Sequence, residues 1–146
     1  MFFFKIWIQI QEALLAEGDK ADVEEELAAY ASLLPTGKNL PFVLYFEIEN
    51  AVVREKLLKQ YCGTENALSL VLGNGKRVLG KALDDGVSRV TEEGKTSAVH
   101  FLEFPLTLAE ANAAKGPIQI VSDHPNYLHA ASLSESTWQT LKRELD

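Results

Sequence analysis

The side chains best suited to chemistry in this chain are its three imidazoles, His100, His124 and His129, together with Asp123. Histidine and carboxylate groups are common zinc and iron ligands, and a site needs three or four of them at about 2.0–2.3 Å from the metal. His124 and His129 lack the three- or four-residue spacing that aligns two ligands on a helix, although distant residues can converge in space. We therefore assign no metal ligands. One hypothesis is a small enzyme or metal-binding redox protein that uses His100, Asp123 and His124.

The same residues also have a structural interpretation. His100 shares a predicted strand face with Ala98, Leu102 and Phe104, which is typical of a buried, hydrogen-bonded histidine. The block 123–126, Asp-His-Pro-Asn, fits a rigid turn, because proline suits the second position of a type I turn and Asp or Asn can hydrogen-bond the local backbone. Structural roles are favoured for both.

Two basic residues, Arg89 and Lys95, lie on a long polar segment, Asp84–Lys95, which we predict to be a mobile loop. If this segment approaches His124 and Asn126, these side chains form a small cationic pocket in an otherwise acidic protein. Such a pocket suits an anionic ligand. Our candidate ligand-binding residues are therefore Arg89, Lys95, His100, Asp123, His124 and Asn126.

Other motifs are weaker. Gly94-Lys95-Thr96-Ser97 resembles the end of a phosphate-binding P-loop, but that motif needs a glycine where the chain has Arg89 and must lead into a helix. Glu47, on a predicted strand, is a second-rank acid/base candidate. Cys62 is predicted at a helix C-terminus, where the dipole opposes thiolate formation, so we interpret it as inert. The sequence identifies neither a catalytic group nor a cofactor.

The composition limits the class of protein. The chain has 146 residues and a net charge of −7, with 47% hydrophobic and 24% charged residues, which indicates one globular domain over 1–146. The negative charge argues against nucleic acid and anionic membranes as partners. A single cysteine suits a reducing, cytoplasmic location. The apolar run Met1–Ile10 is shorter than the roughly 20 residues of a membrane span, and Lys5 inside it argues against a signal peptide.

The elements that must position these residues follow from apolar spacing and turn signals. We predict two N-terminal helices, a strand over Phe42–Glu49, a helix capped by Asn50 and ended by Gly63, and a hairpin around Asn74-Gly75. Further strands and short helices follow: Ser97–Phe104, a helix over Leu106–Lys115, Ile118–Ser122, Tyr127–Leu133 and a C-terminal helix from about Ser134. This order predicts a single α+β domain with a largely antiparallel sheet, short crossover helices and a C-terminal helix.

Four separated blocks resemble the signature of a bacterial family of uncharacterised proteins, DUF3501. The blocks are Gln9-Ile10-Gln11-Glu12, Arg89-Val90-Thr91, Gly94-Lys95-Thr96-Ser97-Ala98-Val99-His100-Phe101-Leu102 and Asp123-His124-Pro125-Asn126-Tyr127. The family has no assigned activity. Its gene neighbourhoods imply a redox or oxidative-stress context, and hence a redox-protein partner.

Two departures from the family pattern stand out. The chain begins almost at the first block, so we interpret it as an N-terminally shortened member. Glu103 stands where the family tends to have a basic residue, which argues against an anion site at that position.

The leading functional hypothesis is a cytosolic accessory module that binds a small ligand or a protein, and the small enzyme or metal-binding redox protein is the alternative. If Phe2, Phe3 and Phe4 are not covered by their own domain, they form an apolar patch, from which we predict a homodimer through the N-terminus.

Overall fold

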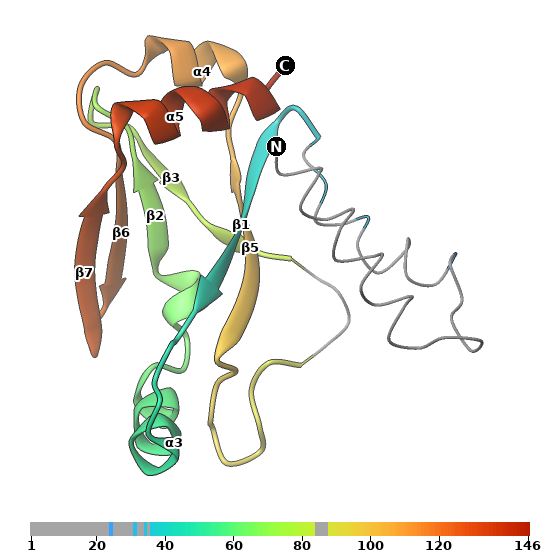
Figure 1. The fold of residues 1–146 in the computed structure, drawn as a ribbon, viewed down its shortest axis with the longest axis vertical. Helices are drawn as coiled ribbons and strands as arrows, with labels where there is room; N and C mark the ends of the chain where they lie inside the picture. Colours follow the sequence, from blue (N-terminus) through green and yellow to red (C-terminus); the bar gives the residue numbers. More distant parts are fainter. Residues whose placement is uncertain (1–23, 25–30, 32–33, 35, 84–87) are drawn as a thin grey trace.

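The computed structural model describes residues 24, 31, 34, 36–83 and 88–146, and its strands form two antiparallel sheets (Figure 1). The three-stranded sheet has the order β1-β5-β4, with β1 (Asn39–Tyr45), β5 (Val99–Pro105) and β4 (Lys81–Ala82). The four-stranded sheet has the order β3-β2-β6-β7, with β3 (Arg77–Leu79), β2 (Leu68–Val71), β6 (Gln119–His124) and β7 (Tyr127–Ser132). The α+β class with antiparallel pairing is confirmed, although the strands divide into two sheets rather than one.

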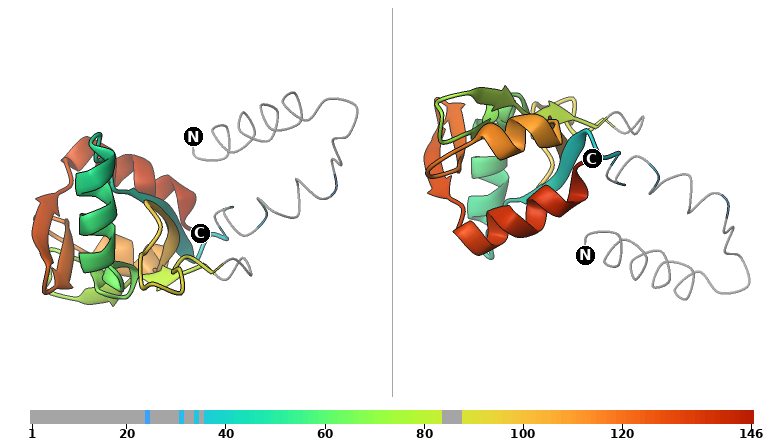
Figure 2. Two further views of the ribbon diagram at one scale, coloured as in Figure 1. Left: turned by 90° about the horizontal axis from the view of Figure 1, so that it is seen from below. Right: turned by 90° about the horizontal axis from the view of Figure 1, so that it is seen from above.

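Helices lie at both ends of these sheets. In Figures 1 and 2, α4 and α5 lie together at one end, and α3 lies at the opposite end. The helices and short 3-10 turns are α3 (Ala51–Gln60), η2 (Thr64–Asn66), α4 (Leu108–Ala113), α5 (Glu135–Leu141) and η3 (Lys142–Glu144). The predicted C-terminal helix is confirmed, whereas the two predicted N-terminal helices and the Phe2–Phe4 interface fall outside the described residues. No helix in the described part of the chain is long and apolar enough to cross a membrane.

The predicted hairpin is confirmed, and its second arm joins the two sheets. β2 pairs with β3, and the Asn74 side chain accepts a hydrogen bond from the Lys76 amide at 3.0 Å in the connecting turn. After β3 the Gly80 amide donates to the Leu68 carbonyl, and the chain then enters β4, which pairs with β5 of the other sheet. The second arm of the hairpin therefore continues as two short strands, β3 and β4, because the chain changes sheets between them.

The hydrophobic core lies between the sheets and the end that carries α4 and α5. Phe42 and Phe104 stack across β1 and β5 with ring centroids 4.3 Å apart. Trp138 of α5 is 3% exposed, as the apolar spacing of that helix predicts. The buried members of this core are Leu40, Leu70, Leu72, Val78, Phe104, Leu106, Ala111, Ile118, Trp138 and Leu145.

The helix α3 is held mainly by its ends, because Leu58 is its one buried residue. Asn50 caps its start, with the side-chain oxygen accepting from the Val52 and Val53 amides at 3.0 Å each. Gly63 follows its end with a φ of +92°, a conformation that glycine adopts without steric cost. Both predicted boundaries are confirmed. Since few side chains pack under α3, contacts at its C-terminus decide where it lies.

Candidate functional site

The turn between β6 and β7 supplies those contacts. His124 Nε2 lies 3.0 Å from the Cys62 carbonyl oxygen, and the Asn126 side-chain amide donates to the Gln60 carbonyl at 2.9 Å. The Gln60 carbonyl is the last one of α3 and has no partner within the helix, so the bond from Asn126 satisfies it. A carbonyl only accepts, which places the proton on Nε2, and Nδ1 then accepts from the Asn126 backbone amide at 3.3 Å. Both ring nitrogens of His124 are therefore bonded within the protein.

The remaining residues of this block also act locally. The turn predicted over 123–126 is formed by Pro125 and Asn126, with His124 and Tyr127 as the closing pair, whereas Asp123 belongs to β6. The Asp123 carboxylate forms an ion pair with the Arg77 guanidinium of β3, with oxygen and nitrogen 2.7 Å apart. Both side chains are about half exposed, so the pair contributes little to stability.

His100, on β5, is buried next to the segment that precedes its strand. Its side chain is 2% exposed, and its Nε2 atom lies 3.0 Å from both the Ser97 carbonyl and the Thr96 hydroxyl. Burial lowers the pKa of His100 below its ordinary value, while the nearby Glu65 carboxylate opposes that shift. The prediction of a buried, hydrogen-bonded histidine is confirmed.

The other nitrogen of His100 faces a carboxylate that the sequence did not single out. Nδ1 lies 4.0 Å from Oε2 of Glu65, a residue of the short turn η2 whose side chain is 13% exposed. Within the described part of the chain, Glu65 Oε2 is buried without a hydrogen-bond partner. Both residues line a cavity of about 220 Å³, whose walls are formed by Glu65, Asn66, Ala82, Leu83, Arg89, Val90, His100 and Phe101.

Arg89 reaches this cavity from a tight turn. The predicted loop lies partly outside the described residues, at 84–87, but its second half is closed by hydrogen bonds from the Thr91 amide to the Lys95 carbonyl and from the Gly94 amide to the Thr91 carbonyl, each 2.9 Å long. Gly94 has a φ of +75°, which the turn needs and which a side chain would disfavour. The Arg89 guanidinium carbon lies 4.9 Å from the centroid of the Phe101 ring, within cation–π range.

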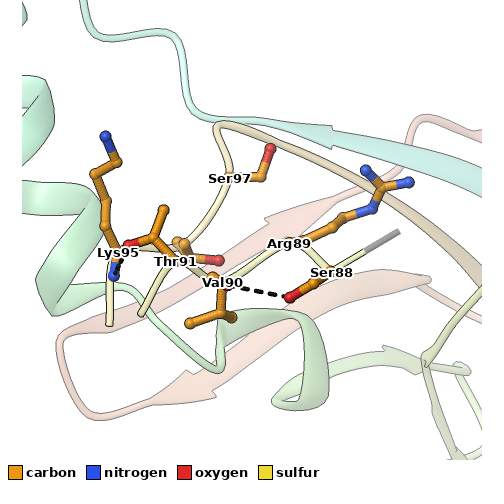
Figure 3. Close-up of a pocket in the computed structure, with 7 residues that line it drawn as sticks. Ser88, Arg89, Val90, Thr91, Lys95 and Ser97 are labelled. Carbon is orange, nitrogen blue, oxygen red and sulfur yellow. Dashed lines mark hydrogen bonds between the residues drawn. The ribbon is translucent and has the colours of Figure 1, made fainter. Parts of the chain in front are cut away.

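A second cavity, of about 400 Å³, also has Arg89 in its lining, and Figure 3 shows the residues that line it. The Lys95 ammonium and the Arg89 guanidinium point away from each other there, so they do not converge on one anion. Two hydroxyls of this lining form hydrogen bonds within the turn: Ser88 donates to the Val90 carbonyl, and Thr91 accepts from the Lys95 amide.

The candidate residues thus fall into two groups. Arg89 lines one cavity together with His100 and a second cavity together with Lys95, whereas neither lining contains Asp123, His124 or Asn126. The His124 group instead bonds to the end of α3. Aromatic rings link the two groups, because Phe46 contacts the rings of both His100 and Tyr127.

The remaining candidates, Cys62, Glu47 and Glu103, line neither cavity. Cys62 follows the C-terminus of α3 as predicted, and its carbonyl rather than its thiol makes the contact with His124. Glu47 is exposed, and Glu103 accepts a hydrogen bond from Asn39 at 2.6 Å. In the described part of the chain, no three His, Cys, Asp or Glu side chains are grouped so that they could hold a metal ion.

Comparison with known proteins now places the chain. The model of a family described as a protein of unknown function, DUF3501, matches residues 4–145. The chain belongs to the DUF3501 family. A crystal structure of a novel protein of unknown function from Burkholderia pseudomallei K96243 is similar to this DUF3501 chain, with a TM-score of 0.83 and 34% sequence identity. The similarity covers 97% of this chain and 75% of the other. No curated protein matches the chain.

Proposed function

We propose that this DUF3501 protein is a small-ligand-binding module and that its site is the cavity beside His100. The observation that carries the proposal is Glu65, a residue of the cavity lining whose carboxylate oxygen Oε2 is buried without a hydrogen-bond partner among the described residues. Leaving a buried charged acceptor unbonded costs free energy, and such a group in a native protein calls for an explanation. A ligand that donates to it is that explanation.

The composition of the walls supports the same proposal. Glu65, Arg89 and His100 supply polar groups, and Leu83 and Phe101 supply apolar surface. A few convergent polar groups on an apolar lining are typical of small-molecule sites. Arg89 and His100, two of the residues predicted from the sequence, belong to this site, whereas Asp123, His124 and Asn126 are occupied in holding the turn against α3. An accessory role toward a redox protein stays a prediction, since only the family resemblance implies it.

The proposal is tested with the whole chain labelled with ¹⁵N and titrated with small amines, amides and carboxylates. We expect one class to shift the amide signals of Glu65, Leu83 and Phe101 in a saturable way. Ala82→Leu, which adds bulk to the cavity lining, should abolish the response. The matched control is Ala130→Leu on β7, an exposed strand position that lines neither cavity, which should retain it. The proposal is wrong if no compound of the panel produces a saturable shift at these residues.

A further inference from the structure

We infer that the ligand of this cavity carries a primary ammonium group, seated between Glu65 Oε2 and His100 Nδ1. The inference rests on the proposed function and names the class of ligand: a short aliphatic amine in its protonated form. It is carried by two acceptor atoms that face each other 4.0 Å apart in a buried position.

The neighbours of the His100 imidazole determine which of its nitrogens carries the hydrogen. The Ser97 carbonyl, 3.0 Å from His100 Nε2, can only accept a hydrogen bond, so Nε2 carries the hydrogen. In the neutral ring Nδ1 is then an acceptor with its lone pair directed away from Ser97. Burial, the largest influence on the His100 pKa, lowers it and so favours this neutral ring near pH 7.

His100 Nδ1 and Glu65 Oε2 are separated by a gap of 4.0 Å. A carboxylate is likewise an acceptor, so neither atom can donate to the other in these states. Protonating the carboxyl group does not close the gap, because 4.0 Å is longer than a hydrogen bond. A single donor atom set about 2 Å to the side of the line that joins them can lie about 2.9 Å from each, which is the usual N–H···O and N–H···N distance. The donor must carry at least two hydrogens.

An ammonium group suits this position, beside Glu65 and His100, better than other donors do. Glu65 is a carboxylate, and a hydrogen bond between an ionised donor and an ionised acceptor is roughly twice as strong as one between neutral groups. At the His100 ring, burial lowers the pKa, the Glu65 carboxylate raises it by favouring the charged imidazole, and Arg89 lowers it. A zinc ion would need three or four protein ligands, and this position offers two.

The walls of the cavity limit the size and polarity of the rest of the ligand. The cavity holds about 220 Å³, and Leu83, Val90 and Phe101 form its apolar part. An alkyl chain of a few carbons can lie against these side chains while the ammonium group faces Glu65. A tertiary or quaternary amine cannot supply two N–H donors, so the site should distinguish amines by their number of hydrogens.

The test uses the whole chain and follows the ¹⁵N signals of the His100 ring. The probe is ethylammonium at pH 7, compared with tetramethylammonium, a cation without N–H groups, and with acetamide, a neutral donor. We expect ethylammonium to shift the Nδ1 signal in a saturable way and to bind at least about tenfold more tightly than either comparison compound, which corresponds to one lost hydrogen bond.

A substitution provides the second arm. Glu65→Gln keeps the shape of the side chain, removes its charge and replaces one acceptor by an amide donor, so ethylammonium binding should fall at least tenfold, or about 1.4 kcal/mol. The matched control, Glu92→Gln, changes an exposed carboxylate on the neighbouring turn that lines neither cavity and should leave binding unchanged. If Glu65→Gln fails to fold, the selectivity among the three compounds still decides.

The outcomes separate the two proposals. If acetamide or tetramethylammonium binds as tightly as ethylammonium, or if Zn²⁺ alone shifts the Nδ1 signal, the ammonium inference is overturned while the cavity remains a binding site. If a carboxylate of the wider panel binds and no amine does, the inference is also overturned. If nothing in the panel shifts the cavity residues, the proposed function fails and the inference fails with it.

Discussion

His100 and His124 are both buried imidazoles, but their surroundings leave them in different states. Both ring nitrogens of His124 are bonded to backbone groups, at Cys62 and Asn126. Only one nitrogen of His100 is bonded within the described chain, and the other faces Glu65 across 4.0 Å. The comparison teaches that two buried histidines of one chain can differ in how many of their ring nitrogens are bonded. That difference predicts how each region responds to substitution.

The largest effect is expected at the turn. His124→Ala leaves the Cys62 carbonyl and the Asn126 amide without their partner, so the free energy of unfolding should fall by about 1–3 kcal/mol. Urea denaturation measures the loss, and an unchanged m-value would show that stability alone has changed. The control is His129→Ala, an exposed position that should change stability by less than about 0.5 kcal/mol. Equal effects of the two variants would contradict the structural role of His124.

A smaller effect of opposite sign is expected at the cavity. Glu65→Gln replaces a buried carboxylate, whose Oε2 has no hydrogen-bond partner among the described residues, by a neutral amide, so the free energy of unfolding should stay level or rise by up to about 1 kcal/mol. Urea denaturation without added amine measures it. A loss of more than about 1 kcal/mol would mean that Glu65 already has a strong partner, and the contrast between the two histidines would then disappear.

The pH dependence of stability sharpens the comparison further. Burial lowers the pKa of His100 in the folded state below its ordinary 6.5, so the unfolded chain binds more protons than the folded chain as pH falls through that range. The contribution of His100 to the free energy of unfolding is therefore fully present above pH 6.5 and is lost as the pH falls toward the folded pKa. His100→Gln should show a shallower decline, measured by urea denaturation between pH 5 and 8. In Glu65→Gln the decline should be steeper, because Glu65 no longer favours the imidazolium. Parallel curves for all three proteins would contradict the assignment.

The smallest effect is expected at Lys95. Its ammonium group points away from Arg89 in the second cavity, and it does not line the cavity beside His100 (Figure 3). Lys95→Met should therefore change the free energy of unfolding by less than about 0.5 kcal/mol and leave the ethylammonium response unchanged. A tenfold loss of amine binding in the titration would show that the two cavities act as one site.

Local signals made several parts of the fold predictable. Asn50 and Gly63 bound α3, and Asn74-Gly75 turns the hairpin, because capping and turn preferences depend on residues next to each other in the sequence. The exchange of sheets after β3 was not predictable. Gly80 donates to Leu68 in one sheet while the following residues pair with β5 in the other, and this arrangement depends on strands that are distant in sequence.

The sequence by itself determined the α+β class, the family and the chemical types of the candidate residues. It also indicated that His100 is buried and that 123–126 form a turn, since alternation and proline chemistry are local properties. Only the tertiary structure decided which residues meet. It separated His124 and Asn126 from Arg89, and it brought Glu65 of η2 against His100 of β5. The physical reason is that a contact between distant residues is set by strand pairing and packing of the whole chain, whereas a single sequence carries only the local preferences of each segment.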